Sequence, residues 1–273
     1  VVLFNPYLDE VVTIDKKGRD NSILSLWACS RHLSKLDFDV LINLHPNERC
    51  SFIDAMTSVK LRTGTTHKIF KWFWDVFTPL DRSMHAADMY LDVLQQLGVQ
   101  DLSSNGLEIF PGEEHFLEAE LFWQEQNITD QDKLIGFNIG SAVPTKRWPP
   151  ERFAEVADIF AAKGYKTVFF GGPMDEEMVA EATGYMQTRP IIATGHFAIG
   201  GLAAAMRRCC LIITNDSGPM HVAISQKVPI VAMYGPSNPK LYGPYTKDAV
   251  IVTAQPPCQG CADGMKHSCD GLQ

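Results

Sequence analysis

Short apolar runs alternate with helical patterns along the second half of the chain. Six of these runs predict β-strands, at residues 134–140, 166–172, 190–195, 211–216, 229–235 and 249–254. Between the first two, residues 151–165 place Phe153, Val156 and Phe160 on one face of a helix that Gly164 ends. Strand, helix and strand repeated in this order indicate a parallel sheet with helices on both faces.

The first half shows a weaker form of the same alternation. We expect helices over residues 21–36, 48–59 and 86–98, and a buried strand over residues 38–44. Residues 63–85 are aromatic and basic without clear periodicity, and we interpret them as a loop or broken helix at the edge of a cleft. Residues 111–132 predict an acidic helix that leads into the second block. We therefore place a domain boundary near residues 128–133, which gives domains of residues 1–130 and 131–273.

Composition excludes several classes of function. A length of 273 residues suits two domains, and 45% apolar with 21% charged residues is typical of water-soluble globular proteins. The net charge of −8 argues against a nucleic-acid groove, and no apolar run has the length of a transmembrane helix. The first ten residues lack the basic region of a signal peptide, and seven cysteines indicate reduced thiols. We therefore expect a cytoplasmic location.

Small and polar residues follow five of the predicted strands in the second half. They are Ser141, Lys146 and Arg147; Gly171, Gly172, Pro173, Asp175 and Glu176; Gly195 and His196; Asn215, Asp216, Ser217, Gly218 and His221; and Gly235, Pro236, Ser237 and Asn238. In an open parallel sheet, ligands bind beyond the carboxyl ends of the strands. The convergence of these five loops predicts a ligand site along one rim of the sheet.

The loop after the fourth strand suits an anionic ligand such as a diphosphate. Asp216 or Ser217 can cap the helix that begins near Gly218. The free N–H groups and the dipole of that helix favour phosphate oxygens, and a glycine lets the backbone approach closely. His221, one turn into the helix, can donate to a phosphate oxygen, and Lys146 adds positive charge from a neighbouring loop.

Each of these residues also has an ordinary structural interpretation. Asp216 and Ser217 would then only cap the helix, and His221 would be packed in the core. Asp175 and Glu176 suit the first turn of a helix, where acids complement the dipole. Because an acid is unfavourable beside a diphosphate, a ligand-binding Asp175 or Glu176 would instead contact sugar or ribose hydroxyls. The five converging loops favour the ligand site over these separate explanations.

Two stretches of the second half resemble glycosyltransferase family 9, the heptosyltransferases of lipopolysaccharide core synthesis. They are "GSAVPTKRWPPERFAEVADIFAAKGYKTVFFGGP" and "TNDSGPMHVAISQKVPIVAMYGPSNPKLYGP". Weaker motifs, "FDVLINLHPNERCSF" and "LRTGTT", are similar to the amino-terminal half of the family. The resemblance implies an α/β fold of the GT-B class, two Rossmann-like domains facing each other across a cleft, with an incomplete amino-terminal domain here.

The resemblance also implies a reaction and its substrates. These are an inverting transfer of heptose from ADP-heptose to a lipopolysaccharide core acceptor, with no metal or other cofactor. The acceptor is then lipid-linked, and the protein works in the cytoplasm at the inner face of the inner membrane. The donor domain is the carboxy-terminal one, and the amino-terminal domain faces the acceptor.

Carried over position by position, the resemblance assigns eight residues to the donor site. They are Ser141, Lys146, Asp175, Glu176, Asp216, Ser217, Gly218 and His221. Ser141 falls at a hydroxyl position, and Lys146 at the basic residue that meets the diphosphate. Asp175 or Glu176 falls near the acid that holds the nucleoside. The family's general base is a carboxylate after the first strand of the amino-terminal domain, which we expect upstream of Val1, so no catalytic residue is assigned.

The acceptor side rests on basic residues near the ends of amino-domain strands. They are His45, Arg49, Lys60, Arg62 and His67, which could meet acceptor phosphates or carboxylates. Ordinary surface charge is the alternative interpretation of each one. An inverting transfer requires a base for the acceptor hydroxyl and fixed positive charge where the diphosphate leaves. Only the second requirement is visible in this sequence.

A last candidate site lies near the end of the sequence. Cys258, Cys261, His267 and Cys269 have the ligand types of a zinc or iron–sulfur site. The family resemblance implies plain thiols at similar places, and we expect no metal there.

Two rival functions remain open. One is a nucleotide-sugar 2-epimerase on the same fold, which needs no acceptor. The other is a binding protein that keeps the nucleotide-sugar site without catalysis. Acceptor-dependent release of nucleotide distinguishes the transferase from the epimerase.

Overall fold

A computed structural model of the chain describes residues 2–45, 47–64, 73–77, 81, 83–102 and 104–253. The chain divides into two units, one formed by Glu10–Ser104 and one by Val1–Asp9 together with Asn105–Gln273. The predicted division at residue 130 differs from this one. Helix α4 (Glu113–Glu125) packs against α7 (Ile199–Met206), and Phe4 lies edge-on against His115 at 5.4 Å. Both segments therefore belong to the larger unit.

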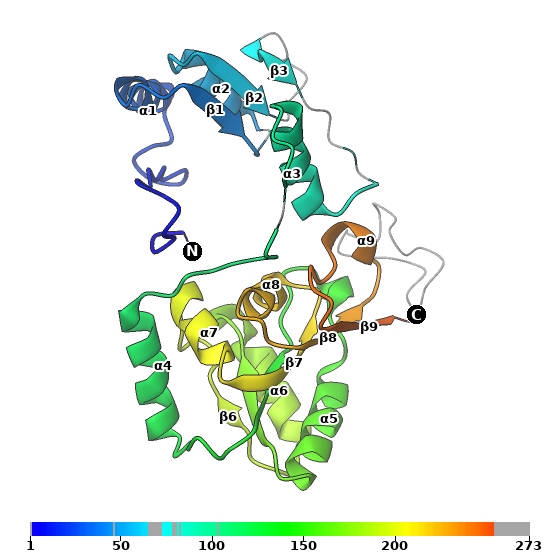
Figure 1. The fold of residues 1–273 in the computed structure, drawn as a ribbon. Helices are drawn as coiled ribbons and strands as arrows, with labels where there is room; N and C mark the ends of the chain where they lie inside the picture. The colour runs from blue at the N-terminus through cyan, green and yellow to red at the C-terminus, as the bar shows by residue number, and fades with distance from the viewer. Residues whose placement is uncertain are drawn as a thin grey trace. The chain divides into compact units, whose positions relative to one another are not determined.

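The smaller unit, residues 10–104, contains a parallel sheet in the order β1-β2-β3. Its strands are β1 (Val40–Asn43), β2 (Leu61–Gly64) and β3 (Val76–Phe77), and its helices are α1 (Ile23–Lys35), α2 (Glu48–Met56) and α3 (Ala86–Gln96) (Figure 1). The three predicted helices and the strand predicted at residues 38–44 are confirmed. In their described part, residues 63–85 hold the end of β2 and the short strand β3, which corrects the predicted loop or broken helix. Thr63 pairs with Val76, a contact that no local periodicity signals.

A buried carboxyl group lies between α2 and β1 of this unit. Asp54 on α2 is 9% exposed and accepts a hydrogen bond from Asn43 Nδ2 at the end of β1. Burial raises the pKa of the Asp54 carboxyl from 3.8 to about 6, although Asn43 and the Arg62 guanidinium oppose the rise. The folded unit therefore binds this proton more tightly than the unfolded chain does.

We expect this proton to make the stability of the smaller unit fall as the pH rises. Because the pKa of Asp54 is higher in the folded than in the unfolded chain, its proton stabilises the folded state. This stabilisation is complete below about pH 3.8 and is lost by about pH 6. The size is on the order of 2–3 kcal/mol. The whole chain is unfolded with urea at several pH values between 4 and 7. The amide NMR signals of residues 10–104 then report the stability of the smaller unit. Asp54→Asn should remove this part of the pH dependence, and equal slopes for the two proteins would contradict the assignment.

The described part of the larger unit contains a sheet of six parallel strands in the order β6-β5-β4-β7-β8-β9. They are β4 (Leu134–Asn138), β5 (Lys166–Phe170), β6 (Ile191–Ile192), β7 (Cys209–Asn215), β8 (Ile230–Tyr234) and β9 (Ala249–Thr253). Each lies within or overlaps one of the six predicted strands, so that prediction is confirmed. The central strands β4, β5 and β7 are almost entirely buried, which is why they are continuous apolar runs in the sequence.

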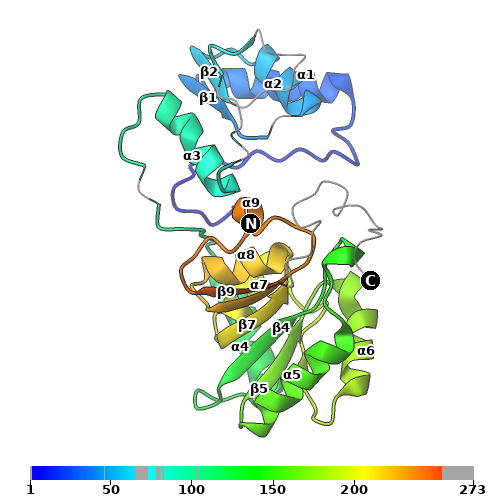
Figure 2. The same cartoon turned by 90° about the vertical axis from the view of Figure 1, so that its right-hand side faces the viewer.

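Helices cover both faces of this sheet (Figure 2). Helices α5 (Pro150–Ala162) and α6 (Glu176–Tyr185) pack together over one face, around Phe137, Phe153 and Phe169. Helices α4, α7 and α8 (Gly218–Ser225) belong to the other face, with Trp123 and Phe170 in their core. No helix in the described part of the chain is long and apolar enough to cross a membrane.

The strand order places a topological switch point between β4 and β7. The chain moves outward from β4 through β5 and β6, then returns to the other side of β4 to continue through β7, β8 and β9. Loops after neighbouring strands leave in opposite directions at such a point, and ligands bind in the resulting crevice. The residues after β4 and β7 therefore carry the candidate site.

Candidate functional site

A buried amide joins the two loops at the switch point. Asn215, at the end of β7, is fully buried. Its Oδ1 accepts a hydrogen bond from the backbone N–H of Trp148 at 2.9 Å, and its Nδ2 donates to the carbonyl oxygen of Ile139 at 2.6 Å. One side chain therefore holds both ends of the loop between β4 and α5, which carries Ser141 and Lys146.

We expect Asn215→Ala to destabilise the larger unit by about 2–5 kcal/mol. The change leaves the N–H of half-buried Trp148 and the buried carbonyl of Ile139 without this partner, at about 1–3 kcal/mol each. The urea midpoint of this unit measures the effect. Gln187→Ala, at an exposed position of the same unit, should change stability by less than about 0.5 kcal/mol. If Asn215→Ala lowers the stability by no more than Gln187→Ala does, the amide does not hold the loop.

The carboxylate of Asp216 is the centre of a buried polar group, which we call the Asp216 network. Lys146 Nζ lies 2.7 Å from Asp216 Oδ2, and Ser237 Oγ donates to the same oxygen at 2.5 Å. The side chains of Lys146 and Asp216 are 12% and 5% exposed, and Ser237 is 1% exposed. The three residues follow β4, β7 and β8, so three adjacent strand ends bring them together. Asp216 Oδ2 therefore accepts from both Lys146 and Ser237.

The loops after β4 and β8 also contact each other through backbone. A Cβ atom on Gly235 would lie 3.1 Å from the carbonyl oxygen of Thr145. This residue of the β8 loop therefore lies close against the 3₁₀ turn η2 (Pro144–Lys146), which carries Lys146. The close approach holds the turn that carries Lys146 against the loop that carries Ser237.

A buried phenol lies beside the Asp216 network. Burial, with the nearby Asp216 carboxylate, raises the pKa of Tyr234, so its hydroxyl stays protonated and donates to the carbonyl oxygen of Tyr242 at 2.9 Å. Neither Tyr234 nor Ser237 was among the predicted donor-site residues. Ser237 was visible as a hydroxyl in one of the five converging loops, whereas Tyr234 lies within the apolar run of β8 and gave no signal.

Helix α8 begins at the switch point without a side-chain cap. Its N-cap residue is Ser217, but no side chain accepts a hydrogen bond at this end of the helix. The expectation that Asp216 or Ser217 caps α8 is therefore wrong, because Asp216 faces Lys146 and Ser237, and Ser217 Oγ accepts a hydrogen bond from Asn138 Nδ2 at 2.8 Å. Gly218 has open space where a Cβ would stand. His221 is half-buried in the first turn.

The remaining predicted donor residues have local roles in the structure. Ser141 is buried, its carbonyl oxygen accepts from Arg147 Nε at 2.8 Å, and its hydroxyl lies 3.4 Å from the N–H of Val143. The Asp175 carboxylate accepts from the N–H of Gly172 at 2.9 Å and lies so close to Gly140 that a Cβ there would collide with it. Glu176 is exposed in the first turn of α6.

Four of the five predicted acceptor residues lie in the described part of the smaller unit, at separate positions on its strands and on α2. His45 follows the carboxyl end of β1, and Arg49, in the first turn of α2, donates to the carbonyl oxygen of Lys16. Lys60 lies at the amino end of β2 and pairs with Asp39 on the surface. Arg62 donates to the carbonyl oxygens of Asp54 and Thr57, so its guanidinium caps the carboxyl end of α2. His67 lies outside the described residues.

The candidate metal ligands Cys258, Cys261, His267 and Cys269 also lie outside the described residues. Within residues 2–253, apart from the gaps given above, no group of three His, Cys, Asp or Glu side chains could hold a metal ion.

The chain is similar to a known family over most of its length. The family model for glycosyltransferase family 9 (heptosyltransferase) matches residues 26–268. A lipooligosaccharide heptosyltransferase 2 from Haemophilus ducreyi is 34% identical over 139 residues, which are 48% of this chain and 40% of that protein. Lipopolysaccharide heptosyltransferase 2 of Salmonella typhimurium is 33% identical over 140 residues, 50% of this chain and 40% of that protein. Both matches thus span well under two thirds of the relatives' length.

The fold is also similar to that of solved structures. A glycosyl transferase family 9 protein from Veillonella parvula is 56% identical, with a TM-score of 0.90 over 93% of this chain and 74% of that one. The Escherichia coli ADP-heptose LPS heptosyltransferase II is 23% identical, with a TM-score of 0.69 over 83% of this chain and 72% of that one. These similarities confirm the predicted α/β fold of the GT-B class.

Proposed function

This chain belongs to glycosyltransferase family 9, and we propose that it transfers heptose from ADP-heptose to a lipopolysaccharide core acceptor with inversion at the sugar carbon. The observation that carries the proposal is the Asp216 network beside the uncapped start of α8, at the switch point of a Rossmann-type sheet. Relatives named as heptosyltransferases support the choice of sugar, and the Escherichia coli protein of the same fold is named for ADP-heptose.

The reaction needs positive charge where the diphosphate leaves. As the acceptor oxygen bonds to the sugar carbon, the bond from that carbon to the diphosphate oxygen breaks, and ADP departs with the electron pair. Lys146 meets this need because an ammonium group has three N–H donors and Asp216 uses only one of them. The first N–H groups of α8 add donors and the positive end of the helix dipole. Gly218 lets the phosphates reach them.

We infer the sugar subsite from the position of Asp216. Lys146 and Ser237 both contact Oδ2, and we propose that Oδ1 of the same carboxylate accepts from a ligand hydroxyl. A carboxylate oxygen accepts strongly from sugar hydroxyls. We assign Asp216 to the heptose, Ser217 and His221 to the region between sugar and diphosphate, and Asp175 or Glu176 to the ribose hydroxyls. Ser141 lies in the same loop as Lys146, between β4 and α5, and we include both residues in the donor site.

The acceptor side is assigned by family membership and by charge. The proposed acceptor is a lipid-linked core sugar reached from the cytoplasmic face of the inner membrane, because the relatives are named for lipopolysaccharide and lipooligosaccharide. A base takes the proton of its hydroxyl as the new bond forms. His45 and Arg49 remain candidates for acceptor phosphates, since both lie at the carboxyl end of β1 or the start of α2.

Release of ADP from ADP-heptose tests the function. We expect release only when a heptose-accepting lipopolysaccharide core is added, and transfer of the sugar should be seen by mass spectrometry of the acceptor. Conversion of the sugar nucleotide without acceptor would indicate an epimerase. Binding of ADP-heptose without turnover in the presence of acceptor would leave a nucleotide-sugar-binding protein and refute the transferase.

A further inference from the structure

A second buried amide, that of Asn138, lies at the switch point. Asn138 is the last residue of β4 and is fully buried. Its Nδ2 donates to two hydroxyls, Ser217 Oγ at 2.8 Å and Thr214 Oγ1 at 3.1 Å. Ser217 is the N-cap residue of α8, and Thr214 lies near the end of β7. One side chain on β4 therefore holds the segment that joins β7 to α8.

The orientation of the Asn138 amide follows from its contact with Thr214. The Thr214 hydroxyl gives its single proton to the carbonyl oxygen of Asn215 at 2.8 Å, so its oxygen accepts from Asn138. The N–H groups of the amide therefore face both hydroxyls, and the oxygen of Ser217 accepts as well. Asn138 Oδ1 is buried and has no hydrogen-bond partner among the described residues.

The unpaired oxygen distinguishes Asn138 from an amide that only stabilises the fold. Asn215, which is also fully buried, pairs both ends of its amide with the backbone. Buried polar groups are generally paired in this way, so an exception calls for a reason beyond packing. The orientation that leaves Oδ1 unpaired is the one that holds Ser217, which makes the position of Ser217 the reason for the exception.

The hydrogen bond from Asn138 diverts Ser217 from the usual role of a serine before a helix. An N-cap serine accepts from the N–H of the second or third helical residue. Pro219 has no N–H, which leaves Met220 as the residue to cap. In the described chain, Met220 N–H instead donates to the Ser217 carbonyl oxygen at 3.2 Å, and no side chain accepts at this end of α8. The place of a capping oxygen, next to exposed Gly218, stays open to a ligand oxygen.

The same hydrogen bond makes the Ser217 hydroxyl a donor. Its oxygen accepts from Asn138, and its own proton is directed at the carbonyl oxygen of Asn215 at 3.4 Å. That distance is long for a hydroxyl donor. A charged phosphate oxygen is a stronger acceptor, so Ser217 can turn its proton to a diphosphate without losing a good hydrogen bond.

We propose that Asn138 is a positioning residue of the donor site, which acts through Ser217 and does not itself touch the ligand. It holds the serine oxygen away from the N–H of Met220, where that oxygen would take the place of a phosphate oxygen, and it leaves the hydroxyl proton to the diphosphate. This inference rests on the proposed binding of ADP-heptose at the start of α8. Without Asn138, Ser217 caps α8 and competes with the ligand.

A double-mutant cycle on the whole chain tests this inference by calorimetric titration with ADP. Asn138→Leu keeps a branched side chain without donors, and we expect ADP affinity to fall about tenfold, the size of one charge-assisted hydrogen bond. In a chain that already carries Ser217→Ala, no hydroxyl can cap α8, so the same change should lower ADP affinity less than about twofold. Asn138→Ala carries the same expectation if urea unfolding shows that the leucine variant does not fold. Equal losses in the two backgrounds, or no loss in either, would overturn the inference.

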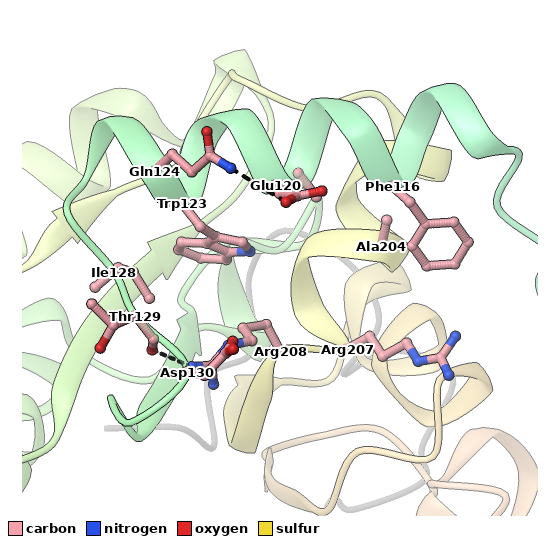
Figure 3. Close-up of a pocket in the computed structure, with 11 residues that line it drawn as sticks. Phe116, Glu120, Trp123, Gln124, Ile128, Thr129, Asp130, Ala204, Arg207 and Arg208 are labelled. Carbon is pink, nitrogen blue, oxygen red and sulfur yellow. Dashed lines mark hydrogen bonds between the residues drawn. The ribbon is translucent and has the colours of Figure 1, made fainter.

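Gln124→Met is the matched control, because it also replaces an amide with an apolar side chain. Gln124 is exposed near the end of α4, where its Nε2 donates to Glu120 Oε1 at 3.3 Å beside a cavity of about 770 Å³ (Figure 3). It precedes β4, whereas Asn138 ends that strand. ADP affinity should change less than about twofold in this variant.

The position of Ser217 separates this inference from the proposed function. In a crystal structure of Asn138→Leu without nucleotide, we expect Ser217 Oγ within about 3.2 Å of the backbone nitrogen of Met220. A Ser217 side chain that stays away from Met220 overturns the inference, whether or not the chain binds ADP. If the original chain binds no ADP while Ser217 caps α8 in the variant, the proposed function fails and the positioning of Ser217 by Asn138 stands.

Discussion

Replacing Lys146 by methionine should lower ADP affinity by 10- to 100-fold and destabilise the larger unit by about 3 kcal/mol. The first effect is the loss of charge-assisted contacts to the diphosphate, at about 1.5–3 kcal/mol. The second arises because the change leaves the Asp216 carboxyl group, 5% exposed, without its partner ammonium. Calorimetric titration with ADP measures the first effect, and urea unfolding measures the second.

A double variant separates the two roles of Lys146. Lys146→Met with Asp216→Asn removes both charges, so stability should return to within about 1 kcal/mol of the original chain. ADP affinity should stay as low as in Lys146→Met. Lys133→Met, which removes an exposed lysine before β4, should leave affinity and stability unchanged. If Lys146→Met binds ADP as tightly as the original chain, the ammonium does not meet the diphosphate.

Replacing Asp216 by asparagine should reduce ADP-heptose affinity by at least tenfold while ADP affinity changes less than threefold. The amide keeps the shape of the side chain but loses the charge that holds a sugar hydroxyl. The turnover number should fall by about 100-fold, because the sugar carbon is no longer held in line with the acceptor. Paired titrations of ADP and ADP-heptose, with ADP release under saturating donor, measure these effects.

Variants of Ser237 test whether Asp216 must be held in one orientation. Ser237→Ala removes the hydroxyl that donates to Asp216 Oδ2, and we expect about a tenfold loss of turnover with a small change in ADP affinity. Ser237→Thr keeps the hydroxyl and should restore most of the activity. Glu155→Gln, an exposed acid on α5, serves as the charge control. Unchanged ADP-heptose binding in Asp216→Asn would remove Asp216 from the sugar subsite.

The central strands β4 and β5 of the larger unit could be predicted because they are buried on both faces. Such strands are unbroken apolar runs, and Gly164 at φ 86° marks the end of α5 as expected. Strand β3 could not be predicted, since its two residues have no periodicity and are defined only by pairing with β2. The position of α4 depends on its packing against α7, a contact between segments far apart in the sequence.

The composition of the candidate site was predictable, but its internal contacts were not. Asp216, Lys146 and Ser237 all stand in loops after strands, where polar residues are informative. The sequence offered Asp216 or Ser217 as the helix cap, because a cap is the local role of a short polar side chain before a helix. The partners of Asp216 come instead from other loops, Ser237 being 21 positions later, and only the pairing of β7 with β8 brings that hydroxyl to it. Arg62 shows the same effect, since a candidate acceptor-binding residue in the sequence donates to the carbonyl oxygens at the end of α2 in the fold.

The most direct test of the donor site is the distance between Lys146 Nζ and the nearest phosphate oxygen in a crystal structure of the chain with ADP. We predict about 2.7–2.9 Å, with the diphosphate at the first N–H groups of α8 beside Gly218. A nucleotide bound elsewhere, or a diphosphate beyond hydrogen-bond distance of both Lys146 and the start of α8, would contradict the donor site proposed here.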